Sequence, residues 1–225
     1  MNQILTQQPS VKTQSKSKSQ TKSQSKSKSN RLVRWLHSYT SMFMLVIMLF
    51  FTVTGITLNH RDWFESADAP KQLTVDMPDS LSVEGIWDTE PLDQANQLRK
   101  WLSSEHGIYG NKVSYEWEAE ERLLVIDIKR PGGYSIVEAD VEAGEVIVEQ
   151  QNYGVVATLN DLHMGRYSGE LWRGFIDVSA LLMLIFTLTG FWLVIPQKKK
   201  RNKLFAMSVI GTGSMALAYV WLLMA

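Results

Sequence analysis

Three long apolar stretches separate the polar parts of the chain. The first runs from Leu36 to Leu58 and contains no Asp, Glu, Lys or Arg. The second runs from Phe175 to Ile195 with one charged residue, Asp177, near its start, and the third runs from Leu204 to Ala225 with none. A helix rises about 1.5 Å per residue, so each stretch is long enough to cross a hydrocarbon core of about 30 Å. The pattern predicts three transmembrane helices.

The polar segment between the first two stretches has the periodicity of a folded domain. Apolar residues recur at helical spacing from Leu92 to Glu105, and Gly107 follows as a helix stop. Segments rich in Val, Ile and Tyr then alternate with turn residues, which predicts antiparallel strands. The expected strands are Lys112–Glu118, Arg122–Lys129, Tyr134–Asp140 and Glu145–Gln150.

The expected fold is therefore an α-helical membrane protein with three transmembrane helices and an inserted α+β domain. Its expected parts are a disordered tail rich in Lys and Ser (1–30), a first transmembrane helix (31–60), the α+β domain (61–171), a second transmembrane helix (172–196), a basic loop (197–203) and a third transmembrane helix (204–225). The tail has too few apolar side chains to offset the entropy of ordering the chain. It either contacts anionic lipid or serves as a solubilising or topogenic segment.

Charge is distributed unevenly, although the formal net charge is zero. Every Asp and Glu lies between Asp62 and Asp177, whereas basic residues cluster before the first apolar stretch and between Lys198 and Lys203. Positive residues flanking membrane spans favour the cytoplasmic side. We therefore expect a bacterial inner-membrane protein with a cytoplasmic N-terminus and a periplasmic α+β domain.

The absence of cysteine limits the chemistry that is available. It excludes disulfides, thiolate metal sites, iron–sulfur clusters and covalently attached c-type haem. No phosphate-binding loop, dinucleotide-binding glycine motif or hydrolytic triad order is present either. A redox cofactor in this chain would need non-cysteine ligands.

Several short motifs resemble those of one membrane family. They are His37 at the start of the first span, Thr54-Gly55 and Thr189-Gly190 within spans, and Leu162-His163-Met164-Gly165 before the second span. The helix, the hairpins and the acidic turn within 137–147 resemble a PepSY domain. Residues 31 to 200 together resemble the PepSY-associated transmembrane (PepSY-TM) family, and the three-span layout is similar to VciB-like ferric reductases.

This resemblance implies an activity, a cofactor and partners. The implied activity is a ferric reductase that uses b-type haem and passes electrons from a membrane or cytoplasmic donor, such as a quinol of the quinone pool, to periplasmic ferric iron or a ferric chelate. A ferrous iron transporter would take up the product. The alternative is a non-enzymatic, membrane-tethered PepSY module that binds or regulates a periplasmic partner such as a protease.

Two of the four histidines lie at the same membrane boundary in the expected topology. His60 follows the first span and His163 precedes the second. Neutral imidazole is a strong ligand of haem iron, so these two rings are candidates to hold one b-type haem from opposite sides. Alternatively, they are ordinary residues of the membrane boundary, where polar and aromatic side chains are common.

His37 is too far from His60 to share that haem, because the helix between them is about 34 Å long. Its candidate partners are His37 of a second subunit in a homodimer, a non-histidine ligand or a quinol headgroup. It could equally be a solvated histidine at the boundary. Arg34, one turn earlier, would pair with a haem propionate or extend to lipid headgroups.

The two spans also contain an internal repeat. Phe51-Thr-Val-Thr-Gly55 recurs as Phe186-Thr-Leu-Thr-Gly190, on helices expected to run in opposite directions. This is typical of an inverted repeat. The small residues favour close helix packing, and contact with a haem or quinone edge is the second interpretation.

Overall fold

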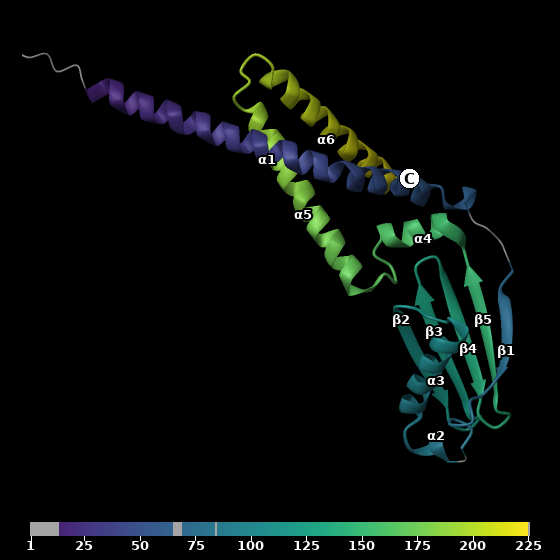
Figure 1. The fold of residues 1–225 in the computed structure, drawn as a ribbon. Coiled ribbons are helices and arrows are strands. Elements are labelled where there is room, and N and C mark those ends of the chain that lie inside the picture. The colour runs from purple at the N-terminus through teal and green to yellow at the C-terminus, as the bar shows by residue number, and fades with distance from the viewer. Residues whose placement is uncertain (1–13, 65–68, 84, 225) are drawn as a thin grey trace, which may run out of the picture. The chain divides into compact units, whose positions relative to one another are not determined.

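The computed structural model describes residues 14–64, 69–83 and 85–224, with side chains from Asn30 onwards (Figure 1). The chain divides into two compact units. One unit contains the residues up to Leu45 together with those from Ala180 onwards, and the other extends from Val46 to Ser179. Each unit is described here by itself.

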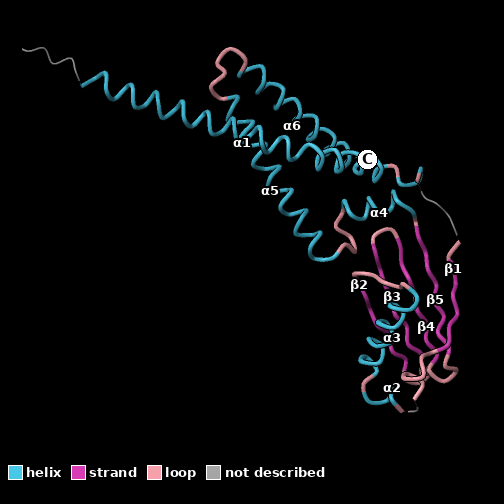
Figure 2. Tube along the Cα trace, in the orientation of Figure 1, coloured by secondary structure: helices cyan, strands magenta, loops and turns pink. Residues whose placement is uncertain are grey.

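Three long helices carry the apolar stretches. They are α1 (Gln14–Asn59), α5 (Gly169–Val194) and α6 (Arg201–Met224) (Figure 2). Among the described residues, the segments long and apolar enough to cross a membrane are Asn30–Asn59 and the whole of α5 and α6. The predicted three-span membrane architecture is confirmed.

The N-terminal tail differs from the sequence prediction where it is described. Disorder was expected for residues 1–30, whereas α1 begins at Gln14; residues 1–13 lie outside the described part of the chain. Extending an existing helix adds one hydrogen bond for each residue fixed, whereas starting a helix costs several residues of order. The span therefore provides the nucleus, and the Ser- and Lys-rich residues only need to continue it.

An antiparallel sheet forms the centre of the second unit. In the part of the chain that the structure describes, five strands pair in the order β1-β5-β4-β3-β2 (Figure 1). Their bounds are β1 (Lys71–Asp76), β2 (Lys112–Glu118), β3 (Leu123–Arg130), β4 (Gly133–Asp140) and β5 (Glu145–Asn152). The helices of the domain are α2 (Ile86–Thr89), α3 (Pro91–His106) and α4 (Gly154–His163).

Alternation along the central strands produces one buried face. Leu124, Ile126 and Ile128 of β3 are fully buried, whereas the residues between them are partly exposed. By the same alternation, Val137 of β4 and Val148 of β5 are buried. These two residues are direct cross-strand partners. Successive side chains in a strand point to opposite faces, so this pattern selects the face that packs against a helix.

Helix α3 covers that face of the sheet. Its buried residues Ala95, Leu98 and Leu102 recur at helical spacing and pack into the core cluster of the sheet. The helix starts at Pro91, which has no backbone N–H and so leaves no donor without a partner at this position. It ends at His106, and Gly107 caps it. Gly107 adopts a φ of 66°, the left-handed conformation that glycine accepts most easily. The predicted helix and its stop are confirmed, and the α+β fold follows.

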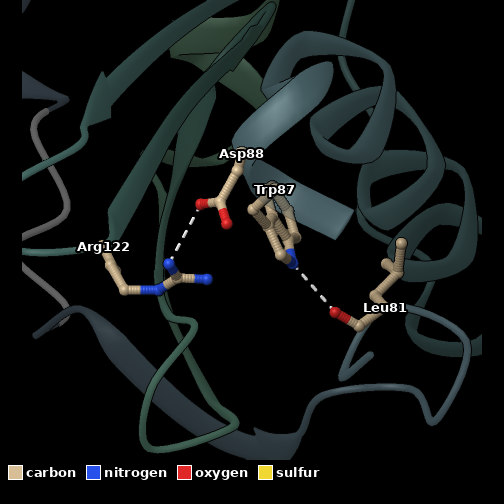
Figure 3. Close-up of polar contacts among 4 residues, drawn as sticks. All are labelled: Leu81, Trp87, Asp88 and Arg122. Atoms are coloured by element: carbon tan, nitrogen blue, oxygen red, sulfur yellow. Dashed lines mark hydrogen bonds and ion pairs between the residues drawn. The ribbon is translucent and has the colours of Figure 1, made fainter. Parts of the chain in front are cut away.

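A tryptophan in α2 fills the remaining space under the sheet. The side chain of Trp87 is 1% exposed and stacks on Trp117 of β2 at 5.5 Å between ring centroids. Its Nε1–H donates to the backbone oxygen of Leu81 at 2.8 Å (Figure 3). The hydrogen bond satisfies the polar atom that burial would otherwise leave without a partner.

Strand β1 was not predicted. Its residues are mostly exposed, with only Val75 half-buried, so the segment lacks the alternation that marks a strand. It is held by its ladder with β5, where Leu73 pairs with Val148. Backbone pairing to an existing sheet edge, rather than burial of its own side chains, determines this strand.

Helix α4 packs tightly on the turn between β3 and β4. A Cβ added to Gly132 would lie 2.9 Å from the backbone N and Cα of Thr158, and closer still to its hydroxyl. The amide of Gly132 donates to Oδ2 of Asp161 at 2.8 Å. Glycine at this turn therefore lets α4 approach the sheet, and Asp161 holds it there.

Gly132→Ala is expected to lower the free energy of unfolding by roughly 1–3 kcal/mol, because the methyl group overpacks the contact and φ is 74°. Gly144→Ala is the matched control, since Gly144 has a φ of 68° but nothing within 4 Å of the added Cβ. Thermal unfolding of both variants separates the steric effect from backbone strain. Equal losses of stability would contradict the tight α4 contact.

Candidate functional site

His163 is the last residue of α4 and packs on the end of α1. Its Nδ1 lies 2.6 Å from Oγ1 of Thr54. The edge of its ring contacts Phe51, with centroids 5.0 Å apart and planes at 75°. Gly55 leaves room beside the ring, because an added Cβ would lie 3.7 Å from Cε1 of His163. Three residues of the repeated motif thus surround one imidazole.

The threonine favours one tautomer of His163. Oγ1 of Thr54 lies 2.6 Å from the carbonyl oxygen of Phe50, four residues earlier in the helix, and can donate its single hydrogen there. With the hydrogen in that bond, Oγ1 accepts from Nδ1–H of His163, and the Nε2 of the corresponding neutral ring carries the lone pair. Among the described residues no group hydrogen-bonds to Nε2.

Further contacts fix α4 against α1 and α5. Oγ1 of Thr57 lies 2.6 Å from Oδ1 of Asn160, one turn before His163 on α4. Nε1 of Trp172 donates to the backbone oxygen of Leu162 at 2.8 Å. The position of His163 is therefore set by neighbours on both sides, as a ligand residue requires.

The second cluster, in the other unit, repeats the arrangement. Nδ1 of His37 lies 3.0 Å from Oγ1 of Thr189, whose hydroxyl donates to the carbonyl of Ile185 at 2.8 Å. The ring stacks on Phe186 with centroids 4.6 Å apart and planes at 8°. A Cβ added to Gly190 would lie 3.2 Å from Cε1 of His37, so the ring would have to shift by a few tenths of an ångström to admit it. As for His163, the threonine favours the tautomer with the proton on Nδ1.

The two clusters are reciprocal. His37, at the start of the first span, packs on the Phe-Thr-x-Thr-Gly motif of the second, and His163, before the second span, packs on that motif in the first. In each motif only the second threonine bonds a histidine; Thr52 and Thr187 are exposed. The sequence predicted the repeat and the candidate histidines as separate features. It did not predict that each histidine contacts one copy of the repeat. The available signal was that a histidine lies at the start of, or just before, each of the two spans that carry a motif.

The predicted pairing of His60 with His163 on one haem stays a prediction. In the structure His60 lies just past the end of α1 and stacks on Trp63, with centroids 4.0 Å apart and planes at 11°. The ring of His163 contacts Thr54 and Phe51 instead.

Arg34, the other predicted cofactor residue, is exposed and forms no ion pair with any residue that the structure describes. Its predicted role in binding a propionate stays a prediction.

Comparison with known proteins identifies the family. A PepSY_TM-like family model matches residues 31–224. The chain belongs to the PepSY_TM-like family. This match includes all three spans and the α+β domain, so it extends to both histidine clusters. No curated protein and no solved structure matches this PepSY_TM-like chain.

The histidine clusters fit a haem ligand set in part. A neutral imidazole whose Nδ1–H is held by an oxygen and whose Nε2 is unprotonated has the form in which histidine binds haem iron. Both His37 and His163 have this form. Each cluster offers one such nitrogen, and within the described residues no second imidazole contacts either ring. The residues therefore fit one axial ligand at each of two positions.

Proposed function

We propose that this PepSY_TM-like protein is a b-haem ferric reductase of the bacterial inner membrane. The observation that supports the proposal is the pair of threonine-bound histidines, each with Nε2 unprotonated and without a hydrogen-bond partner among the described residues. A threonine that only packs helices would not need to bond an imidazole, and a histidine that only marks the membrane boundary would not need a fixed tautomer.

The residues of the chain would hold and shield the cofactor. When bound, b-haem supplies reversible one-electron chemistry. Thr54 and Thr189 orient the imidazoles and strengthen Nε2 as a ligand by accepting from Nδ1. Phe51 and Phe186 cover one side of each ring and exclude water. His37 lies near the start of the candidate span Asn30–Asn59 and Thr54 near its end, which suits electron transfer across a bilayer.

The overall reaction would oxidise one quinol to a quinone, with release of two protons, and reduce two ferric ions to ferrous ions. The clustering of basic residues before α1 and between α5 and α6 supports a cytoplasmic N-terminus and a periplasmic α+β domain. Ferric iron, free or chelated, would then be reduced in the periplasm. A separate ferrous iron transporter would take up the product.

The second axial ligand is part of the proposal. A homodimer could bring His37 of two chains to one haem, since two-fold symmetry supplies the same residue twice. For His163 the candidate is His60, which would have to leave its stack on Trp63. His60→Ala in the purified protein tests this, and we expect a loss of haem as complete as in His163→Ala. Full retention of haem in His60→Ala would exclude His60 as the second ligand.

Absorption spectroscopy of the purified protein in detergent tests the proposal directly. We expect a Soret band and an α-band that appears on reduction with dithionite, together with reduction of ferric citrate by added quinol. A preparation with neither band rejects the haem mechanism. In that case a non-enzymatic PepSY module that binds a periplasmic partner becomes the better interpretation.

Thr54→Val should weaken haem retention about 10- to 100-fold, the usual effect of removing a hydrogen-bond partner of a ligating histidine. Valine keeps the shape of threonine but cannot accept from Nδ1 of His163. Thr52→Val is the matched control, because Thr52 is exposed two residues earlier in the same motif. Haem per protein after dilution or competition with apomyoglobin provides the measurement. Equal retention in the two variants would show that the Thr54 contact is only structural.

A further inference from the structure

A cavity of about 540 Å³ lies in the unit that contains the α+β domain. It is bounded by the chain after α1, the end of the sheet, α4 and the loop before α5. Among its lining residues are Arg61, Lys129, Tyr134, Asp161, Arg166 and Tyr167. Neither His163 nor His37 lines it, so the cavity is separate from the histidine clusters.

Positive charge dominates the described lining of this cavity. Three cationic side chains, Arg61, Lys129 and Arg166, line it, against one carboxylate, Asp161. Asp161 is already engaged, since its Oδ2 accepts from the amide of Gly132 at 2.8 Å. Its Oδ1 is 3.9 Å from Arg166, a distance that leaves most of the guanidinium free to bind another acceptor.

The other two cations differ in how far their charge is balanced. Nζ of Lys129 lies 2.7 Å from Oδ2 of Asp127, and this hydrogen bond raises the pKa of the Lys129 ammonium, so it stays charged at neutral pH and is paired with that carboxylate. Among the described residues, the guanidinium of Arg61 bonds only the sulfur of Met164, a weak acceptor, at 3.3 Å. Arg61 and Arg166 are therefore the cations that keep free hydrogen-bond donors.

Tyrosine side chains also line the cavity. The hydrogen bond of Tyr134 to Glu149, 2.9 Å long, raises the pKa of the Tyr134 phenol, which therefore adds no negative charge at neutral pH. The guanidinium of Arg166 lies over the ring of Tyr167 at 6.0 Å from its centroid. The guanidinium of Arg166 is planar, lies over an aromatic ring and keeps free N–H groups. It can therefore bind a carboxylate or a phosphate through paired hydrogen bonds.

The position of the cavity indicates how a ligand would reach it. Arg61 lies two residues after the end of the candidate span Asn30–Asn59, and Arg166 lies three residues before the span Gly169–Val194 begins. The cavity thus lies at the membrane-proximal end of the domain, within reach of both water and lipid headgroups.

We propose that this cavity is a binding site for an oxyanion, a phosphate or carboxylate group, carried either by an anionic lipid headgroup or by a small water-soluble molecule. Arg61 and Arg166 bind the oxyanion by charge-assisted hydrogen bonds, and Lys129 adds charge. Oxyanion binding at this site does not require haem. The result of its test is therefore independent of the reductase proposal.

The test uses the full-length protein in a zwitterionic detergent. Intrinsic fluorescence or calorimetric titration is performed with citrate, with inorganic phosphate and with micelles containing phosphatidylglycerol, each compared with phosphatidylcholine micelles at the same ionic strength. We expect saturable binding of at least one anionic probe. Arg166→Gln and Arg61→Gln should each weaken it about tenfold or more, the usual effect of losing a hydrogen bond to a charged group.

Lys100→Gln is the control, because Lys100 is an exposed cation on α3 and does not line the cavity. Arg166→Lys, which keeps the charge but not the paired donors, should fall between wild type and Arg166→Gln. Binding of citrate or phosphate alone assigns a soluble ligand, and binding of phosphatidylglycerol alone assigns a lipid. No saturable binding by any probe, or equal binding by wild type and both glutamine variants with unchanged melting temperatures, overturns the proposal.

Discussion

Replacing His163 by alanine is expected to remove the haem signal that belongs to its cluster and to reduce haem per chain by half or more. The reason is that Nε2 of His163 is the one unprotonated imidazole nitrogen that the described residues of this cluster present, and no other side chain there can replace it. Haem per protein by pyridine haemochrome, with the reduced α-band, measures the loss. His37→Ala should remove the remaining share, because the second cluster has the same arrangement.

A histidine in the soluble domain provides the control for this experiment. His106 ends α3, and its ring contacts Trp101 with ring centroids 4.8 Å apart. His106→Ala should therefore keep the full spectrum. If His163→Ala keeps the full haem content while the protein remains folded, the cluster does not ligate haem. If haem persists but ferric reduction stops, His163 acts in electron transfer rather than in retention.

Trp87→Ala is expected to lower the free energy of unfolding by about 3–5 kcal/mol, the usual cost of removing a buried large aromatic side chain. Trp87 is 1% exposed, stacks on Trp117 and has its Nε1–H bonded to Leu81 (Figure 3). Alanine leaves a cavity under the sheet that α2 is too short to close. Urea unfolding in detergent, followed by near-ultraviolet circular dichroism, measures the loss.

The neighbouring residue separates this core effect from surface electrostatics. Asp88 forms an ion pair with Arg122 at 3.0 Å, and its side chain is 60% exposed (Figure 3). Exposed ion pairs contribute roughly 0–1 kcal/mol, so Asp88→Ala should change stability little. A loss for Trp87→Ala no greater than for Asp88→Ala would contradict the position of Trp87 in the core.

Local patterns predicted most of the extramembrane fold. The segments Lys112–Glu118 and Pro91–His106 differ from their predicted bounds by at most one residue, because alternation and helical spacing with a glycine stop leave little choice. Strand β1 and helix α4 were not among the predicted elements. β1 depends on a partner strand distant in sequence, and α4 begins at Gly154, a residue with a positive φ, and has mixed polarity. Pairing partners cannot be derived from local periodicity.

The candidate site was likewise predicted only in part. The sequence identified His37 and His163 and the repeated motif, because few histidines occur and all but one flank a span. It paired His163 with His60 on the basis of membrane side alone, and that pairing stays a prediction. The structure shows Thr54 in contact with His163 and Trp63 in contact with His60, and the first contact depends on how α4 packs on α1, which local periodicity does not encode.

The amino-acid sequence by itself determined the three spans, the α+β domain and the presence of two Phe-Thr-x-Thr-Gly motifs, because these follow from the length and periodicity of apolar residues. Only the tertiary structure decided that each motif contacts a histidine that begins or precedes the other span, and that Arg61, Lys129 and Arg166 line one cavity. These contacts join residues far apart in the chain, and the packing and rotation of α4 and the spans set them, which no local pattern encodes.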